Sequence, residues 1–436
     1  MTEFSRRGFV HTSAFALTGA GIALSAASSA GANEPGTPGA ASPSPYLNIR
    51  DFGAKGDGRA DDTKALLDAM AKATKEAGVV YFPPGHYRTY PVKVPSNITL
   101  LGHSSWAIAG IHTGYQGRTR LTPISANARA FLDLEGQSGT RIQGLSLDGQ
   151  GQGPRMHGIY VSQLGVENGV VIEDCRIESF SGSGVRLDNA WVTAIRRCFI
   201  AGCNEHGIDL SGSYDIWIMD NEIGSKGAAI YAISDTYSGE LPEPRFSAAQ
   251  KMEPNLDPRR AEWTRRKSWG VAATTITACR LEWSKLGGIV LYDSESIQIN
   301  GCSLDQNFGP GIMLTNCRAM TITGCLLRAN GRNRTDDMSC HLRIENSHGV
   351  SATGNSLFGY FERGKKPFSD PAPFYGMVLR NLDASVINAN AMYQSASKKG
   401  VLDYGGHTES MIVGNMHTGS NHEEGAQLNR EKNESK

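Results

Sequence analysis

The stretch CFIAGCNEHGIDLSGSYDIWIMDN, residues 198–221, holds one full period of a repeat. An apolar segment follows Cys198, a polar turn carries Glu205 and His206, and Gly207 opens a second apolar segment. The period closes on Asn221, 23 residues after Cys198. Along the chain the same slot holds either Cys or Asn: Cys175, Cys198, Asn221, Cys279, Cys302, Cys325, Asn355, Asn390 and Asn415.

A period near 23 with short apolar segments predicts parallel strands that stack coil upon coil, about 4.8 Å apart. Residues one period apart then lie above one another. We expect about ten coils between Leu145 and Met416. An Asn in the repeated slot can hydrogen-bond along the stack, and a Cys in the same slot fills it as a small buried side chain.

The repeated Cys or Asn slot, which we call the ladder, holds five of the eight cysteines. Cysteines in an exported protein usually suggest disulfides. Three successive ladder cysteines cannot all pair within one chain, so the five in the ladder are predicted to be free and structural. The pairing of the remaining three is left open: Cys203, Cys317 and Cys340.

A second column of residues follows the turn of each coil. Its strands begin at a glycine in seven coils, namely Gly158, Gly184, Gly207, Gly288, Gly311, Gly376 and Gly400. Strand alternation turns the residue after each glycine inward and the next one outward. The outward column is therefore predicted to be Tyr160, Arg186, Asp209, Tyr231, Val290 and Met313.

Three motifs precede the repeat: DFGAKGDGRADDT (51–63), VVYFPPGHY (79–87) and PSNITLLG (95–102). Asp61, Asp62 and Thr63 supply N-cap chemistry for a helix reaching about Ala77. In this order the motifs resemble the start of pectate-lyase-like proteins of the rhamnogalacturonase/epimerase type. The resemblance implies an all-β, right-handed parallel β-helix, with the short N-terminal helix capping its open end. It does not select an activity, because this family hosts hydrolases, lyases, epimerases and phage tailspikes.

The chain is predicted to have four parts. Residues 1–32 read as a signal peptide whose Arg6-Arg7 pair resembles the twin-arginine (Tat) export signal of bacteria. Residues 33–45 read as a linker, 46–417 as the β-helix domain, and 418–436 as a disordered tail. Insertions at 235–270, 328–340 and 358–375 are expected to wall a groove over the second column. We therefore expect a periplasmic or secreted bacterial protein that uses the Tat export machinery.

The composition of the chain argues against nucleic acid as a binding partner and against a membrane span. The 436 residues carry no net formal charge and are 20% charged. No basic excess indicates nucleic acid, and the apolar run of the signal is too short for a membrane span. No metal or other cofactor is predicted; the sequence does not decide a need for calcium, nor the oligomeric state.

Polar residues gather on the first four coils. We predict Glu205, His206, Asp209 and Asp188 as catalytic residues, and we predict a substrate-binding set of His157, Tyr160, Arg186 and Tyr231. A carboxylate pair across a groove is typical of glycoside hydrolysis. An arginine beside a histidine or tyrosine is typical of β-elimination or epimerisation of a uronate. Each residue also has a purely structural interpretation: an ion pair between coils for Arg186 and Asp209, and turn residues bonded to backbone for both histidines.

Polygalacturonase-like members of the family carry Asn-Thr-Asp, Gly-Asp-Asp and Gly-His-Gly before this strand in three consecutive coils. The corresponding triplets here are 155–157 (Arg-Met-His), 181–183 (Ser-Gly-Ser) and 205–207 (Glu-His-Gly). Only His206-Gly207 matches, so chemistry with those three aspartates is not expected.

Three hypotheses follow for the function. The leading one is an exported enzyme that hydrolyses a polysaccharide with carboxylates around Glu205 and Asp209. The second is a lyase or epimerase of a uronate-containing glycan. The third is a non-catalytic carbohydrate-binding or envelope protein that uses the same groove. The sequence does not identify the glycan or distinguish endo from exo action.

Overall fold

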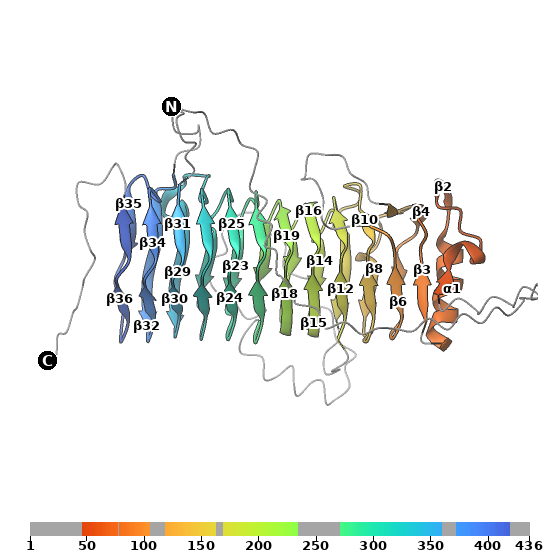
Figure 1. The fold of residues 1–436 in the computed structure, drawn as a ribbon, viewed down its shortest axis with the longest axis horizontal. Coiled ribbons are helices and arrows are strands. Elements are labelled where there is room, and N and C mark those ends of the chain that lie inside the picture. The colour runs from red at the N-terminus through yellow and green to blue at the C-terminus, as the bar shows by residue number, and fades with distance from the viewer. Residues whose placement is uncertain are drawn as a thin grey trace, which may run out of the picture. The chain divides into compact units, whose positions relative to one another are not determined.

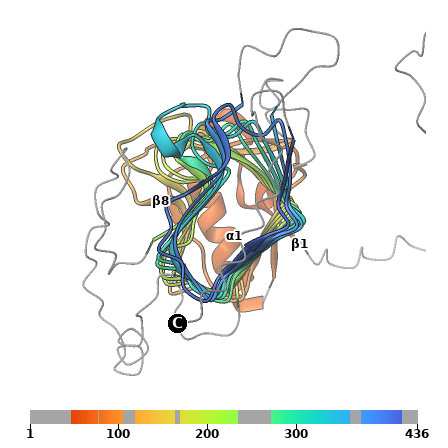
Figure 2. The same cartoon turned by 90° about the vertical axis from the view of Figure 1, so that its left-hand side faces the viewer.

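The computed structural model describes residues 46–76, 78–104, 118–162, 169–233, 271–359 and 372–418. These residues form three parallel sheets, two of 13 strands and one of 11, with one strand of each sheet in most coils. The coils stack along one axis (Figure 1) and enclose a narrow three-sided cross-section (Figure 2). The fold is the predicted all-β, right-handed parallel β-helix.

The three sheets have the following strands. The first sheet contains β1 (Tyr46–Asn48), β3 (Val79–Tyr81), β6 (Thr99–Leu101), β9 (Arg141–Gln143), β12 (Val171–Glu173), β15 (Trp191–Arg196), β18 (Tyr214–Met219), β21 (Thr275–Thr277), β24 (Gln298–Asn300), β27 (Thr321–Thr323), β30 (Ser351–Thr353), β33 (Val386–Asn388) and β36 (Met411–Val413). The second sheet contains β2 (Asp57–Asp61), β4 (Gly85–Thr89), β7 (Thr119–Pro123), β10 (Ser146–Asp148), β13 (Arg176–Glu178), β16 (Phe199–Cys203), β19 (Glu222–Ser225), β22 (Arg280–Glu282), β25 (Ser303–Asp305), β28 (Leu326–Arg328), β31 (Ser356–Phe358), β34 (Ala391–Tyr393) and β37 (Met416–Thr418). The third sheet contains β5 (Val92–Lys93), β8 (Ala130–Glu135), β11 (His157–Ser162), β14 (Val185–Leu187), β17 (Ile208–Asp209), β20 (Ala228–Ala232), β23 (Gly287–Tyr292), β26 (Ile312–Thr315), β29 (Cys340–His348), β32 (Tyr375–Asp383) and β35 (Lys399–Asp403).

The ten coils expected between Leu145 and Met416 are present, because the second sheet runs from β10 to β37 in ten strands. Three more strands of that sheet, β2, β4 and β7, come before them. The N-terminal motifs therefore build coils of their own as well as the cap. The short 3-10 helix η1 (Ile49–Phe52) lies among them.

The helix α1 (Thr63–Glu76) lies across the end of the coils (Figure 2). Its buried stripe includes Leu66, Met70 and Ala73, which join the main core. Asp61 accepts a hydrogen bond from the Thr63 amide at 2.9 Å, as expected for a residue at the start of a helix. The carboxylate of Asp62 has a different role from the predicted cap, since it accepts hydrogen bonds from backbone amides of the preceding loop.

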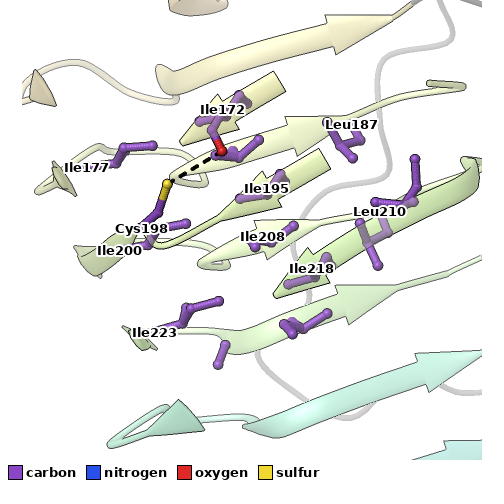
Figure 3. Close-up of a cluster of buried hydrophobic side chains, with 14 of the residues drawn as sticks. Ile172, Ile177, Leu187, Ile195, Cys198, Ile200, Ile208, Leu210, Ile218 and Ile223 are labelled. Carbon is purple, nitrogen blue, oxygen red and sulfur yellow. Dashed lines mark hydrogen bonds between the residues drawn. The ribbon is translucent and has the colours of Figure 1, made fainter. Parts of the chain in front are cut away.

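The repeated slot forms a hydrogen-bonded ladder where it holds Asn. The Asn355 amide donates to Oδ1 of Asn390 at 2.9 Å, and the Asn390 amide donates to Asn415 at the same distance. Each Asn also donates to a backbone carbonyl in the coil before it. Inward isoleucines and leucines of successive coils pack beside the ladder around Cys198 (Figure 3).

All eight cysteines are buried and free. The five ladder cysteines are thus free, as predicted, and the question left open for Cys203, Cys317 and Cys340 is answered in the same way. The ladder thiols lie near backbone carbonyls; the sulfur of Cys198, for example, is 3.7 Å from the Ile172 oxygen (Figure 3).

The third sheet has the predicted alternation. Ile159, Val185 and Ile208 pair in register and are fully buried inside the coil. The outward column continues beyond Met313 to Arg343, and it extends back from Tyr160 to Asp133 and Lys93. The 3-10 helix η2 (Asp336–Met338) belongs to the insertion at 328–340. Its Met338 packs on an apolar cluster of this sheet's outer face.

The predicted signal peptide and linker lie outside the described residues, as do the predicted tail after Thr418, the insertion at 235–270 and most of the one at 358–375. Among the described residues, no helix has the length and apolar character needed to cross a membrane.

Candidate active site

The outer face of the third sheet brings most of the predicted site residues together. Tyr160 pairs in register with Arg186, Arg186 with Asp209, and Asp209 with Tyr231. These four side chains therefore occupy one column over four successive coils, about 4.8 Å apart. His157 is the first residue of β11, and His206 lies in the turn before β17, so both precede the residues of this column.

The centre of the column is a buried ion pair. The Arg186 guanidinium donates to the Asp209 carboxylate, and the two residues are 8% and 2% exposed. Burial alone would disfavour the ionised carboxylate, but the charge of Arg186 and the hydroxyl of Ser211 (2.8 Å) outweigh it and hold the pKa of Asp209 below its usual value. The pair joins adjacent coils, as the structural interpretation expected, but both side chains are buried rather than exposed to solvent.

The two histidines are anchored to the backbone in the same way. Nδ1 of His157 accepts the Ser183 amide hydrogen at 2.9 Å, and Nδ1 of His206 accepts that of Ala228 at 3.0 Å. Burial lowers the pKa of His157 to about 3 and that of His206 to about 4. Both rings are therefore neutral near pH 7, and because Nδ1 is an acceptor, the ring proton is on Nε2.

Glu205 is bound by a residue that the sequence analysis did not include. Nε of Arg155 donates to its carboxylate across two coils, and the Ser183 hydroxyl lies 3.5 Å away. Glu205 is only 6% exposed, and this burial raises the pKa of its carboxyl although Arg155 acts in the opposite direction. Arg155 was missed because it lies in an irregular turn, 50 residues before its partner, where the 23-residue register gives no guidance.

Tyr160 and Asp188 form the outer side of the site. The Tyr160 hydroxyl donates to Asp188 at 3.2 Å, and burial raises the pKa of Tyr160 above its usual value. Asp188 is half-buried, which makes it the most exposed of the predicted catalytic carboxylates. The guanidinium of Arg129 lies 3.9 Å from the centre of the Tyr160 ring and also binds Asp133. Sequence reasoning missed both, because the column was traced only from Tyr160 onward.

Tyr231 follows Asp209 in the column and precedes the apolar Val290. Its ring stacks on His206 with a centroid distance of 3.9 Å and an interplanar angle of 3°. It also packs against an apolar cluster that includes Val290, Tyr292 and Met313. The face is thus polar over the first coils and apolar over the next ones, as the sequence predicts.

No group of three or more His, Cys, Asp and Glu side chains in the described ranges is arranged to hold a metal ion. What the site offers instead is a fixed set of hydrogen-bond donors and charges. Arg186 and the protonated Nε2 atoms of two neutral histidines can stabilise negative charge, and Asp188 and Tyr231 are the half-buried groups able to move a proton.

Comparison with known families places the chain as follows. Residues 46–239 match the family "Rhamnogalacturonase A/epimerase, pectate lyase-like", and residues 267–433 match "Right handed beta helix region". The mannuronan C5-epimerase AlgE6 of Azotobacter vinelandii is 28% identical over 177 residues, which cover 37% of this chain and 20% of that protein. A polygalacturonase of Prunus persica is 36% identical over 117 residues, 26% of this chain and 27% of that enzyme.

Among solved structures, the A-module of the mannuronan C-5 epimerase AlgE4 from Azotobacter vinelandii has a TM-score of 0.59 at 16% identity. The match covers 86% of this chain and all of that module. At this identity the likeness establishes the shared β-helix fold. The chain spans less than a third of the length of both relatives given above.

Proposed function

Because this chain is a pectate-lyase-like, right-handed parallel β-helix protein, we propose that it acts on a uronate-containing polysaccharide by moving the proton on C5 of a uronate. Epimerisation and β-elimination both start with this step. The similarity to mannuronan C5-epimerases supports the proposal but does not carry it.

The observation that carries the proposal is the Arg186–Asp209 pair between two neutral histidines. Loss of the C5 proton places extra negative charge on the uronate carboxylate. Donors that are already fixed at that point stabilise such charge without reorganisation. Arg186 is held by Asp209, and the charge of Asp209 acts on both His157 and His206, so these groups lie close together.

The same geometry supports a proposal for the proton transfers. Neither histidine can act as the base, since Nδ1 is occupied by a backbone N–H and Nε2 carries the proton. Tyr160 has a raised pKa and donates to Asp188, so it remains protonated. We assign Asp188 as the base, and Tyr231 with His206 as the donors to C5 or to the leaving oxygen. Glu205 and Asp209 then position Arg155 and Arg186.

Hydrolysis is the second candidate, and one observation favours it. The pKa of Glu205 is raised whereas that of Asp209 is lowered, which is the contrast expected of a general acid and a general base. Against it, both carboxylates are buried and bound by arginines. A hydrolytic water would have to displace Arg186 to reach Asp209.

The test uses the purified protein with alginate, polygalacturonate and neutral glucans. Ultraviolet absorbance of unsaturated uronates reports elimination, reducing ends report any cleavage, and the nuclear magnetic resonance spectrum of the polymer reports epimerisation. We expect new double bonds or a changed epimer ratio on a uronate polymer. Reducing ends without either change would contradict the proposal and support hydrolysis. Binding without any chemical change would support the non-catalytic alternative.

A further inference from the structure

Six successive turns lead from the second sheet to the third between β19 and the turn after β34, and four of them carry positive charge in their described part. The cations are Lys226, Lys285, Arg332, Arg334 and Lys398, which we call the cationic edge. The three lysines are exposed and the two arginines are half-buried. These turns stack through backbone hydrogen bonds; the Phe308 amide, for example, donates to the Ser284 carbonyl of the preceding coil at 2.8 Å.

Aromatic rings lie between the cations. The Lys285 ammonium is 3.4 Å from the centre of the Phe308 ring, and the Lys398 ammonium is 3.6 Å from that of Phe374. The guanidinium of Arg334 lies 4.6 Å from the Phe374 ring on the same turn line. Within the described part of the chain, neither Lys285 nor Lys398 has a carboxylate partner. The rings hold the cations in place without neutralising them.

Acidic groups do not cancel this charge. In the described part of these six turns, the acidic residues are Asp336 and Asp337, both in η2. Asp337 is bound by Arg343 at 2.8 Å and by the Tyr404 hydroxyl at 3.1 Å. The edge is therefore positive over several coils although the whole chain carries no net formal charge.

The edge also reaches the candidate active site. Lys226 Nζ donates to Oδ1 of Asn204 at 2.7 Å, one residue before Glu205. The Gly227 amide donates to the Glu205 carbonyl at 2.6 Å. From Lys226 to Lys398 the edge covers five steps of about 4.8 Å, roughly 24 Å in all, which several sugar residues would span.

We propose that the cationic edge is a second binding surface, on which an anionic polysaccharide docks while one of its sugars occupies the active site. Only the identity of the acidic group as a uronate rests on the proposed function. Charged contacts at an exposed surface are screened by salt, so the edge should tighten binding of long chains at low ionic strength and contribute little for short oligomers.

The test compares Lys226→Ala/Lys285→Ala/Lys398→Ala with Lys64→Ala/Lys72→Ala/Lys75→Ala, which removes the same charge from exposed positions of α1. Binding of long-chain alginate, an alginate hexamer and a neutral β-glucan is measured by calorimetry at low and high salt. We expect the edge variant to bind the long chain about three- to tenfold more weakly at low salt, with the hexamer unchanged. The α1 variant should bind like the wild type.

The proposal is wrong if both variants lose affinity equally, if the edge variant keeps full affinity, or if the edge variant loses as much affinity for the neutral β-glucan as for long-chain alginate. This experiment measures binding only and not catalytic turnover of the polysaccharide. Failure of the C5 chemistry therefore leaves the binding result intact, and failure of the edge leaves the chemistry intact.

Discussion

Arg186 and Asp209 show how one pair of residues serves both the fold and the proposed chemistry. Two charges that are this deeply buried are costly unless each is fully bound. Here each is the other's main partner, and Ser211 completes the set around the carboxylate. The remaining donor capacity of Arg186 is therefore fixed in place before any substrate arrives.

Replacement of this arginine tests its role directly. Arg186→Lys keeps the positive charge but removes the planar set of donors, so we expect activity on the uronate polymer to fall roughly 100-fold or more. Arg318→Lys is the matched control, because Arg318 binds Glu295 across the same 23-residue step in a more exposed position. It should leave activity unchanged. Equal kinetics for Arg186→Lys and the wild type would contradict the assignment.

The histidines predict how stability depends on pH. His157 and His206 have folded-state pKa values of about 3 and 4, below the usual 6.5, so the unfolded chain takes up protons first on acidification. Stability is then complete above about pH 6.5 and falls as the pH drops toward 4. The fully buried His341, whose pKa burial lowers to about 3, contributes in the same direction. Between neutral pH and about pH 5, the free energy of unfolding in urea should decrease by roughly 4–6 kcal/mol.

A variant identifies the group responsible. His206→Gln should lose about a third of this pH dependence, whereas the exposed His348→Gln should retain it. An unchanged slope in His206→Gln would show that the pH dependence arises elsewhere.

At the scale of elements, the ladder is what keeps the coils in register. Each Asn of the C-terminal ladder bonds to the next coil and to the previous one, so a single side chain joins three coils. A one-residue slip would turn every inward residue of a strand outward. The ladder and the buried isoleucines therefore specify the same register.

Asn390→Ala breaks the ladder in its middle. It removes bonds to Asn355, Asn415 and a carbonyl, and it leaves buried partners unpaired. We expect a loss of roughly 2–4 kcal/mol in the free energy of unfolding, measured in urea. Asn333→Ala, at an exposed turn position, should change it by less than about 0.5 kcal/mol. Similar values for the two variants would contradict the structural role of the ladder.

The free cysteines give a second prediction for the elements. All eight are buried, so a thiol reagent should label none of them in the folded protein and all eight after unfolding without reductant. Fewer than eight thiols in the unfolded protein would mean that disulfides form between ladder cysteines.

For the whole molecule, the repeat made it possible to predict which residues lie above one another in the sheets, but not the contacts made by residues in the turns. The glycines that precede these strands, Gly158, Gly184 and Gly207, predicted the pairing of Tyr160, Arg186 and Asp209, because residues at the same position in successive coils lie above one another. The repeat could not predict the contact between Arg155 and Glu205, since irregular turns and long side chains are not fixed by register. The roles of the histidines also required the structure, because only the positions of backbone amides reveal which ring nitrogen accepts.

In the proposed account, the outer face of the third sheet and the cationic edge have different roles. The column around Arg186 acts on one uronate, and the cationic edge holds the rest of the chain. This division predicts that the edge variant loses activity on long polymers through a higher KM, with kcat unchanged.

The most direct test of the central claim is hydrogen exchange at C5. The protein is incubated with a uronate polymer in D2O, and deuterium at C5 is measured by nuclear magnetic resonance in the epimerised residues, or the loss of H5 in unsaturated chain ends. The account predicts C5 chemistry by the wild type that is lost in Arg186→Lys and kept in Arg318→Lys. Cleavage that leaves every C5 hydrogen in place would contradict it.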